Sequence, residues 1–316
     1  MIKNDGITND IKELKEKLSD NIENLVFIDD DKVKKLDFLK TNSTEIQVFS
    51  GMYGDINISI KEFSALKVKN RIFDNFLQEI NTACKTIHPN VPKFYGVGFN
   101  NTKIYLIYDL IKGESLKKKC ESLNLKEKLN MLIQAVKIIT DLHKQDIAHK
   151  GLRTNKFIVD NTNKIFLKDL GEINYEKGTS EANMSSEETN NWCVYYAPEY
   201  FNHEDEDSND EDETEESIKK YNELNAKFDI WSLGCIISEI CSGVIPWTNY
   251  SNTGKSSKVK VMSYLLDKKN FPIPEIIINE FKELSEILKC CLKINAEERI
   301  KSSELLEKLE KYYNSL

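Results

Sequence analysis

The chain has 316 residues, of which 40% are hydrophobic and 30% charged, enough for one bilobed domain with a short extension. Its formal net charge is −8, but residues 204–216 carry ten acidic side chains and no basic one, which leaves about +2 elsewhere (−8 + 10). This local acidity argues against a general nucleic-acid-binding surface. The apolar runs are too short to span a bilayer and the N-terminus lacks a signal-peptide pattern, so we expect no nucleic-acid partner and no membrane insertion.

The cysteines predict reduced thiols. There are seven, an odd number, and most lie inside apolar runs without the spacing of a disulfide framework. Such usage is typical of a cytosolic protein. Cys290 and Cys291 could be read as a redox pair, but adjacent side chains on a helix point in different directions, which favours core packing.

Residues 1–45 are polar and rich in Lys, Asp and Asn. Asn9 and Asp10 predict the cap of a short amphipathic helix that carries Ile11, Leu14 and Leu18 on one face. We expect this helix to dock on the domain that follows. A helix that binds a partner is the alternative.

Alternating apolar and polar residues at 46–49 and 56–60 predict a β-hairpin and a following strand. Gly51 and Gly54 lie between the two runs, and Lys61 directly follows the second.

A helix is predicted next, over residues 73–87, and ends before Pro89, which cannot continue it. It carries Glu79, 18 positions after Lys61 (79 − 61), so the helix can lay this carboxylate against the strand lysine.

A buried strand is predicted at 104–110, followed by a long helix whose core face repeats at helical spacing. This helix leads into a loop, His149-Lys150-Gly151-Leu152-Arg153-Thr154-Asn155-Lys156, and then into two short strands and Asp169-Leu170-Gly171. We expect His143 and His149 to be structural.

The polar stretch 172–194 predicts a flexible loop whose Ser and Thr hydroxyls are candidate phosphorylation sites, although such residues are common in any loop. Ala197-Pro198-Glu199 follows it, and Asp229 and Arg299 lie further along the chain.

In this order and at these intervals, Lys61, Glu79, Asp169-Leu170-Gly171, Ala197-Pro198-Glu199, Asp229 and Arg299 resemble the motifs of a protein kinase domain, from about residue 50 to 309. The resemblance implies an α+β, bilobal protein kinase-like fold, with a small five-stranded β lobe carrying one main helix and a large, mainly helical lobe. We assign residues 1–45 to an N-terminal extension and 46–315 to the kinase-like domain, with an acidic disordered insertion at 203–217.

The resemblance also implies roles for single residues. Lys61, Glu79, Lys156 and Asp169 would line a nucleotide site, with Gly51 and Gly54 as a weak glycine loop over the phosphates. His149, Glu199, Asp229 and Arg299 would be structural.

Two positions depart from the kinase pattern. Gly151 stands where the catalytic Asp is expected, and Lys156 stands where an Asn holds the second metal ion. We therefore expect no catalytic residue, no metal site, no required cofactor, and ATP binding that is weak and depends little on magnesium.

The short hairpin at 49–53 and the loop without its Asp resemble the pseudokinase domains of the mixed lineage kinase domain-like family, in the truncated form of some poxviruses that lacks the four-helix bundle. The resemblance implies a protein of the host cell cytoplasm that sequesters the host's third receptor-interacting protein kinase and so inhibits necroptosis. Phe201 and Tyr221 flank the acidic insertion and are candidate interface aromatics.

Two features depart from that family: Asp169-Leu170-Gly171 is closer to active kinases, and the insertion has no counterpart. The alternatives are an allosteric scaffold for another kinase and a weakly active serine/threonine kinase.

Overall fold

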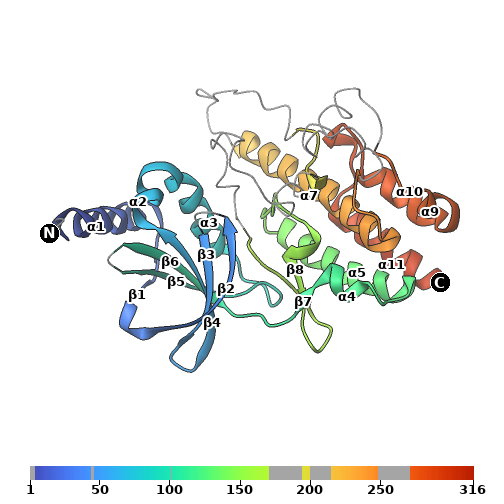
Figure 1. Ribbon diagram of the computed structural model, residues 1–316. Coiled ribbons are helices and arrows are strands. Elements are labelled where there is room, and N and C mark those ends of the chain that lie inside the picture. The colour runs from blue at the N-terminus through green and yellow to red at the C-terminus, as the bar shows by residue number, and fades with distance from the viewer. Residues whose placement is uncertain (1–3, 44–45, 101, 171–193, 200–214, 248–270) are drawn as a thin grey trace, which may run out of the picture. The chain divides into compact units, whose positions relative to one another are not determined.

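The computed structural model describes residues 4–43, 46–100, 102–170, 194–199, 215–247 and 271–316 (Figure 1). The chain divides into two compact units. Unit 1 comprises Met1–Lys112 and Lys168–Tyr175, and unit 2 comprises Gly113–Leu167 and Glu176–Leu316. Unit 1 holds most of the strands and unit 2 most of the helices, in agreement with the expected α+β class.

A six-stranded sheet forms the centre of unit 1, in the order β1-β5-β6-β4-β3-β2. Neighbouring strands pair antiparallel except β1 and β5, which are parallel. The strands are β1 (Phe27–Ile28), β2 (Val33–Ser43), β3 (Ile46–Tyr53), β4 (Ile56–Ser64), β5 (Phe94–Phe99) and β6 (Lys103–Asp109), with a 3-10 turn, η1 (Asp30–Lys32), between the first two.

Four helical segments complete unit 1: α1 (Asn4–Asn21), α2 (Ala65–Lys67), the π-helical turn η2 (Val68–Ile72) and α3 (Phe73–Lys85). Phe76, Glu79 and Ile80 recur at i, i+3 and i+4, so one face of α3 is buried. Phe76 and Ile80 share a core cluster with strand residues such as Phe63 and Leu106. The same face that builds the core therefore places Glu79 inside the unit.

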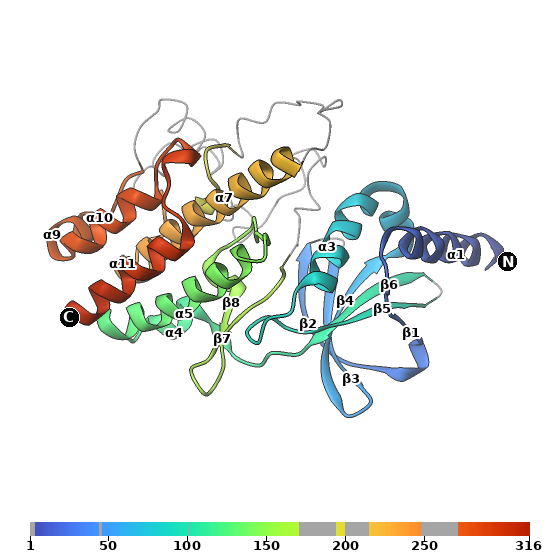
Figure 2. The same cartoon turned by 180° about the vertical axis from the view of Figure 1, so that it is seen from behind.

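The N-terminal 45 residues are more closely integrated than we expected. Helix α1 begins at Asn4, so Asn9 and Asp10 lie in its interior and do not cap it. Leu14 and Leu18 are fully buried in the unit 1 core, and the Lys69 ammonium on η2 binds the carboxylates of Asp10 and Glu13 at 2.7 and 2.5 Å. The helix is docked on the domain, as predicted (Figure 2).

The expected five strands form the antiparallel part of the sheet, the short parallel strand β1 is additional, and the expected boundary at 45/46 falls between two paired strands. Strand β2, inside the supposed extension, pairs with β3 along almost its whole length. Register shifts interrupt the pairing between Lys35 and Phe38, between Phe38 and Lys40, and between Thr41 and Ser43, so β2 lacks the strict alternation by which a strand is recognised in a sequence. The two-residue strand β1 is too short to leave any pattern at all.

Unit 2 is built on two long helices, α5 (Leu125–His143) and α7 (Glu215–Ser242). Asn124 caps α5 in a capping box with Glu127, and residues 129–142 supply its buried face, as predicted. In the described residues of unit 2, the other elements are β7 (Glu114–Ser115), α4 (Leu116–Cys120), η3 (Thr154–Lys156), β8 (Phe157–Val159), β9 (Ile165–Leu167), α9 (Glu275–Glu280), α10 (Lys282–Cys291), η7 (Ala296–Glu298) and α11 (Ser302–Ser315).

The described cysteines are free thiols, and most are buried. Burial raises the pKa of Cys120 to about 11 and that of Cys241 to about 12, so these thiols stay protonated at neutral pH and react slowly. In the Cys290-Cys291 pair, Cys291 is fully buried and Cys290 half-buried on α10, in keeping with packing.

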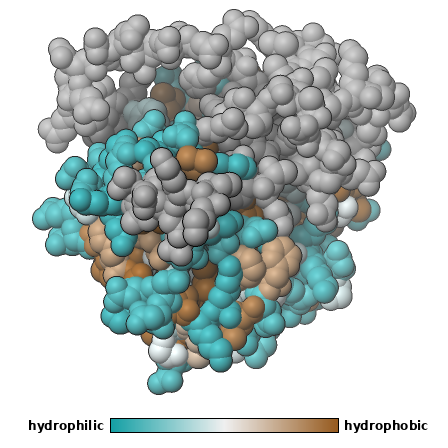
Figure 3. Space-filling model, turned by 60° about the vertical axis from the view of Figure 1, so that its left-hand side comes forward, coloured by the Kyte–Doolittle hydropathy of each residue, from teal (hydrophilic) through white to brown (hydrophobic). Residues whose placement is uncertain are grey.

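Several apolar side chains of unit 1 remain exposed. Figure 3 shows hydrophobic patches on one face of the molecule, each bordered by hydrophilic residues. The exposed apolar residues of unit 1 are Val26, Phe27, Leu36, Phe38, Leu39, Ile56, Leu66 and Ile87. Three of them lie on β2, which is an edge strand. Within the described ranges, no helix has both the length and the apolar character to cross a bilayer.

Most of the acidic insertion lies outside the described residues, as do Phe201 and the loop with the candidate phosphorylation sites. Residues 215–217, which we placed at the end of the insertion, begin helix α7.

Candidate functional site

A buried ion pair joins β4 to α3 in unit 1. The Lys61 ammonium donates to both carboxylate oxygens of Glu79, at 2.8 and 3.0 Å, and the two residues are 4% and 1% exposed. Tyr108, on the neighbouring strand β6, donates its hydroxyl to Glu79 Oε1 at 3.3 Å. The strand lysine and the helix carboxylate thus meet as the 18-residue spacing suggested.

Asp169 belongs to unit 1 and lies beside a second lysine. Its Oδ2 atom is 3.9 Å from Nζ of Lys40, near the end of β2. Asp169 has a positive φ of 58°, an unusual backbone conformation for a residue with a side chain. The aspartate that would bind metal in a kinase therefore has an ammonium group next to it.

The glycines expected over the phosphates are in the wrong place. Gly51 lies within β3, where a Cβ would come within 2.7 Å of both Ile60 Cδ1 and the Lys34 carbonyl, and Gly54 forms the β3–β4 turn with φ +57°. Lys61 pairs with Val48, far from that turn and close to the β2–β3 end of the hairpin. No glycine occurs between Val33 and Ser50. These glycines serve close packing and turn geometry.

In unit 2, Asp229 holds the loop that begins at His149. Asp229 is fully buried on α7, and its carboxylate accepts hydrogen bonds from the backbone N–H groups of His149 (2.7 Å) and Lys150 (2.8 Å). The Gly151 N–H donates to Nδ1 of the His149 ring at 3.2 Å. Lys150 has a φ of 61°. The backbone of the catalytic loop is therefore kept in a defined shape up to Gly151.

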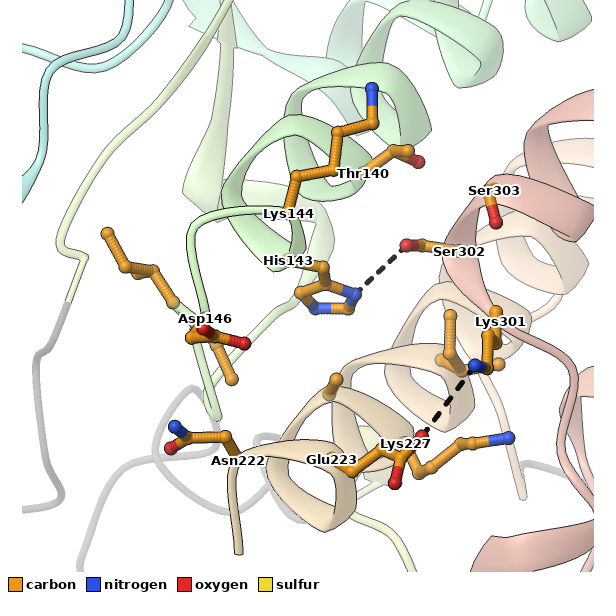
Figure 4. Close-up of a pocket in the computed structure, with 14 residues that line it drawn as sticks. Thr140, His143, Lys144, Asp146, Asn222, Glu223, Lys227, Lys301, Ser302 and Ser303 are labelled. Atoms are coloured by element: carbon orange, nitrogen blue, oxygen red, sulfur yellow. Dashed lines mark hydrogen bonds and ion pairs between the residues drawn. The ribbon is translucent and has the colours of Figure 1, made fainter. Parts of the chain in front are cut away.

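His143 extends this network toward the back of unit 2. One ring nitrogen lies 2.9 Å from Asp229 Oδ2 and the other 3.0 Å from the Ser302 hydroxyl at the start of α11. The same ring lines a pocket of about 330 Å³ between α5, α7 and α11 (Figure 4). Lys301 on its rim pairs with Glu223 at 3.7 Å. His143 thus lines the pocket with one part of its ring and contacts Asp229, which holds the loop, through a ring nitrogen.

Gly151 and Lys156, the two positions that depart from the expected kinase pattern, are both in unit 2. Gly151 offers no side chain to a substrate hydroxyl. Lys156, at the end of η3, is 4% exposed, so its ammonium is held inside the protein. Lys156 belongs to a different unit from Lys61, Glu79 and Asp169.

Glu199 and Arg299 form a two-pronged ion pair. Both terminal guanidinium nitrogens donate to Glu199, at 2.7 Å each, and Arg299 is 1% exposed. The guanidinium also donates to the backbone carbonyls of Lys293 (2.9 Å), Lys227 (3.0 Å) and Ile294 (3.2 Å). Arg299 therefore ties the Ala197-Pro198-Glu199 motif to α7 and to the turn before η7.

Tyr221, the described one of the two candidate interface aromatics, is 58% exposed on α7. The Lys150 ammonium lies 5.0 Å from the centre of its ring and 3.3 Å from its hydroxyl. Tyr221 thus presents an exposed aromatic face directly beside the catalytic-loop segment.

Lys40 and Ser302 were missed by the sequence reasoning. Lys40 stands in a lysine-rich polar stretch with no pattern that singles it out, and only the folding of β2 brings it to Asp169. Ser302 is 159 positions from His143. In the described part of the chain, no three His, Cys, Asp or Glu side chains gather in a way that could hold a metal ion.

Comparison with known proteins places these motifs in a family context. Residues 43–309 match the family described as protein tyrosine and serine/threonine kinase. The chain is 24% identical over 267 residues to serine/threonine-protein kinase cds1 of Schizosaccharomyces pombe, covering 83% of this chain and 53% of that protein. It is 25% identical over 230 residues to mitogen-activated protein kinase kinase kinase 3 of Arabidopsis thaliana, covering 72% and 36%.

A third relative is MAP kinase kinase kinase wis4 of Schizosaccharomyces pombe, with 24% identity over 257 residues, or 71% of this chain and 17% of that protein. The chain thus spans between 17% and 53% of the length of these relatives.

Proposed function

Because this chain belongs to the protein kinase family over residues 43–309, we propose that it is a pseudokinase, which uses the kinase fold for binding and does not transfer phosphate. The observation that carries this proposal is Gly151, in a loop whose backbone Asp229 still holds by two hydrogen bonds. The family match bears out the expected bilobal kinase-like class, and the catalytic status is the step that we add.

The missing carboxylate removes the group that orients the substrate hydroxyl and accepts its proton. In kinases an Asp of the catalytic loop performs this task. Loss of a positioned general base costs roughly 10²–10⁴-fold in rate. The loop backbone is held by Asp229 at His149 and Lys150, and the glycine that follows has no side chain with which to perform this task.

The residues present do not fit a kinase's pair of magnesium ions. A buried ammonium at Lys156 replaces the neutral Asn ligand and would repel a cation. The other ligand position, Asp169, has the Lys40 ammonium 3.9 Å away. We therefore propose that any nucleotide binding is weak and depends little on magnesium, with Lys61 and Asp169 of unit 1 as its residues.

A phosphoryl-transfer assay tests the proposal. The purified chain, incubated with radiolabelled ATP, magnesium and a generic protein substrate, should incorporate no label above the level of Lys61→Met. Typical kinases turn over at about 1–100 per second. Incorporation near that rate, abolished in Lys61→Met, would disprove the proposal.

A weakly active serine/threonine kinase is the second candidate, because the Lys61–Glu79 pair is formed and Asp169 is retained. The names of the curated relatives point the same way. Slow incorporation of label that disappears in both Lys61→Met and Asp169→Asn would favour it.

For the partner, we propose the third receptor-interacting protein kinase of a host cell, sequestered in the cytoplasm so that necroptosis is inhibited. The resemblance to mixed lineage kinase domain-like pseudokinases supports this choice, and the exposed ring of Tyr221 beside Lys150 offers a contact.

Titration of that purified kinase domain onto the immobilised chain tests the partner. Tyr221→Ala should weaken binding by about tenfold or more, as expected for a central aromatic contact. Ile87→Ala, a change at an exposed apolar residue of unit 1, is the control. Binding to a different kinase, identified by co-purification, would instead favour the allosteric scaffold.

A further inference from the structure

A row of three residues crosses the strands of unit 1. Lys40 on β2 lies opposite Val48 on β3, and Val48 lies opposite Lys61 on β4. Residues directly opposite each other in a sheet point to the same face. Adjacent strands are about 4.8 Å apart, so the Cα atoms of the two lysines are about 10 Å apart. Both ammonium groups therefore belong to one face of the sheet.

That face is the one covered by α3. Ile46 and Phe63 are two positions from Val48 and Lys61, and both pack in the core cluster that contains Phe76 and Ile80 of α3. Lys61 itself reaches Glu79 on that helix. Residues two apart in a strand share a face, so the row containing Lys40 lies on the α3 side.

Asp169 meets this row at the Lys40 end. The Lys40 side chain is 41% exposed and that of Asp169 is 17% exposed, so Lys40 remains accessible while its ammonium group balances a largely covered carboxylate. At the other end, the charge of Lys61 is matched by Glu79. The row thus ends in two cations, each of which offsets a carboxylate that would otherwise repel an anion.

We propose that Lys40 and Lys61 form a binding site for a metal-free polyphosphate, such as the triphosphate of ATP, in which the Lys40 ammonium takes the place of the metal ion. This proposal rests on the proposed weak dependence of nucleotide binding on magnesium, and it identifies the Lys40 ammonium as the group responsible. An ammonium next to Asp169 neutralises the carboxylate, lowers its affinity for a divalent cation and leaves N–H donors for phosphate oxygens.

The proposal predicts a reversal in the effect of magnesium. In the unmodified chain, magnesium competes for the phosphates and should leave ATP affinity unchanged or lower it. In Lys40→Met, the negative charge of Asp169 is offset less, so this carboxylate repels metal-free ATP more strongly and attracts a divalent cation more strongly. The affinity of Lys40→Met for metal-free ATP should fall by about tenfold, as for the loss of one charge-assisted contact. Magnesium should raise the affinity of this variant for ATP.

Isothermal titration calorimetry with ATP, and separately with inorganic tripolyphosphate, measures these affinities with EDTA or with magnesium chloride. Lys34→Met is the matched control, since it removes the same charge from the same strand at a position paired with Met52, away from the row. Asp169→Asn in the Lys40→Met background should restore metal-free binding. Unchanged thermal unfolding shows that the exposed Lys40 position tolerates the change.

Three outcomes overturn the proposal: metal-free affinity equal in Lys40→Met and the unmodified chain, binding by the unmodified chain that requires magnesium, or no binding of either probe. Each of them leaves the absence of phosphoryl transfer, which is measured separately, untouched. Tripolyphosphate binding without a preference for ATP would support the lysine row and assign recognition to the phosphates alone.

Discussion

Replacing Arg299 by Met removes the guanidinium that ties Glu199 to α7. Five hydrogen bonds are lost, two to Glu199 and three to backbone carbonyls, and the methionine keeps much of the side-chain volume. Breaking a buried pair by removing one partner costs about 3–5 kcal/mol. Because three carbonyls also lose their donor, we expect about 5 kcal/mol, at the upper end of that range.

The partner residue provides the comparison. The side chain of Glu199 is 33% exposed, and an amide still accepts one hydrogen bond, so Glu199→Gln should cost only about 1–2 kcal/mol. The asymmetry follows from the structure, because Arg299 serves several buried acceptors and Glu199 serves one donor group.

Urea unfolding followed by tryptophan fluorescence measures both variants. Two of the three tryptophans, Trp231 and Trp247, lie in the described part of unit 2, so their signal reports the unit that contains the pair. For a unit of this size, about 5 kcal/mol corresponds to a fall in melting temperature of roughly 10–20 °C. A loss below about 1 kcal/mol in Arg299→Met, or equal losses in both variants, would refute the reasoning.

Three further predictions concern unit 1. Leu14→Ala should destabilise unit 1 by about 2–5 kcal/mol in hydrogen exchange, because Leu14 is fully buried, whereas Lys12→Ala at an exposed site should have little effect. The hydrogen bond to Asp109 raises the pKa of Tyr95 to about 12. The stability that this bond contributes is therefore complete below pH 10 and is lost as the pH rises to 12. An ultraviolet titration of the unmodified chain should show a tyrosine that ionises near pH 12, and the same titration of Tyr95→Phe should lack it. Gly51→Ala should lower the melting temperature, since its Cβ would meet the Lys34 carbonyl at 2.7 Å; an unchanged melting temperature would contradict the packing.

The elements with a strong period were predicted correctly. The buried face of α5 and the helix that carries Glu79 follow from apolar residues at helical spacing, and β6 follows from a continuous apolar run. Such patterns can be read from a short stretch of sequence, because the residues of a helix or strand that face the core recur at the period of that element. The strands β1 and β2 were not predicted, because they lack such a pattern. Bulges interrupt β2 and β1 has only two residues, so neither shows a regular alternation of apolar and polar residues.

Motif spacing anticipated one contact. Lys61 on β4 meets Glu79 on α3, 18 positions later, because a strand and the helix that follows it pack against each other. The glycines at 51 and 54 show the limit of such reasoning. Two glycines in a hairpin look alike in a sequence, and only the pairing of Val48 with Lys61 shows that they lie at the other end of the hairpin.

The amino-acid sequence by itself determined which chemical groups are present: a glycine at 151 and a lysine at 156, where the resemblance to kinases predicts an aspartate and an asparagine, and an aspartate at 169. The tertiary structure decided which groups act on one another. Lys40 contacts Asp169, and His143 contacts Asp229 and Ser302. These pairs are 86 to 159 positions apart in the chain, and no periodic pattern in the sequence connects them. Such contacts depend on strand register and helix packing, which no short stretch of sequence encodes.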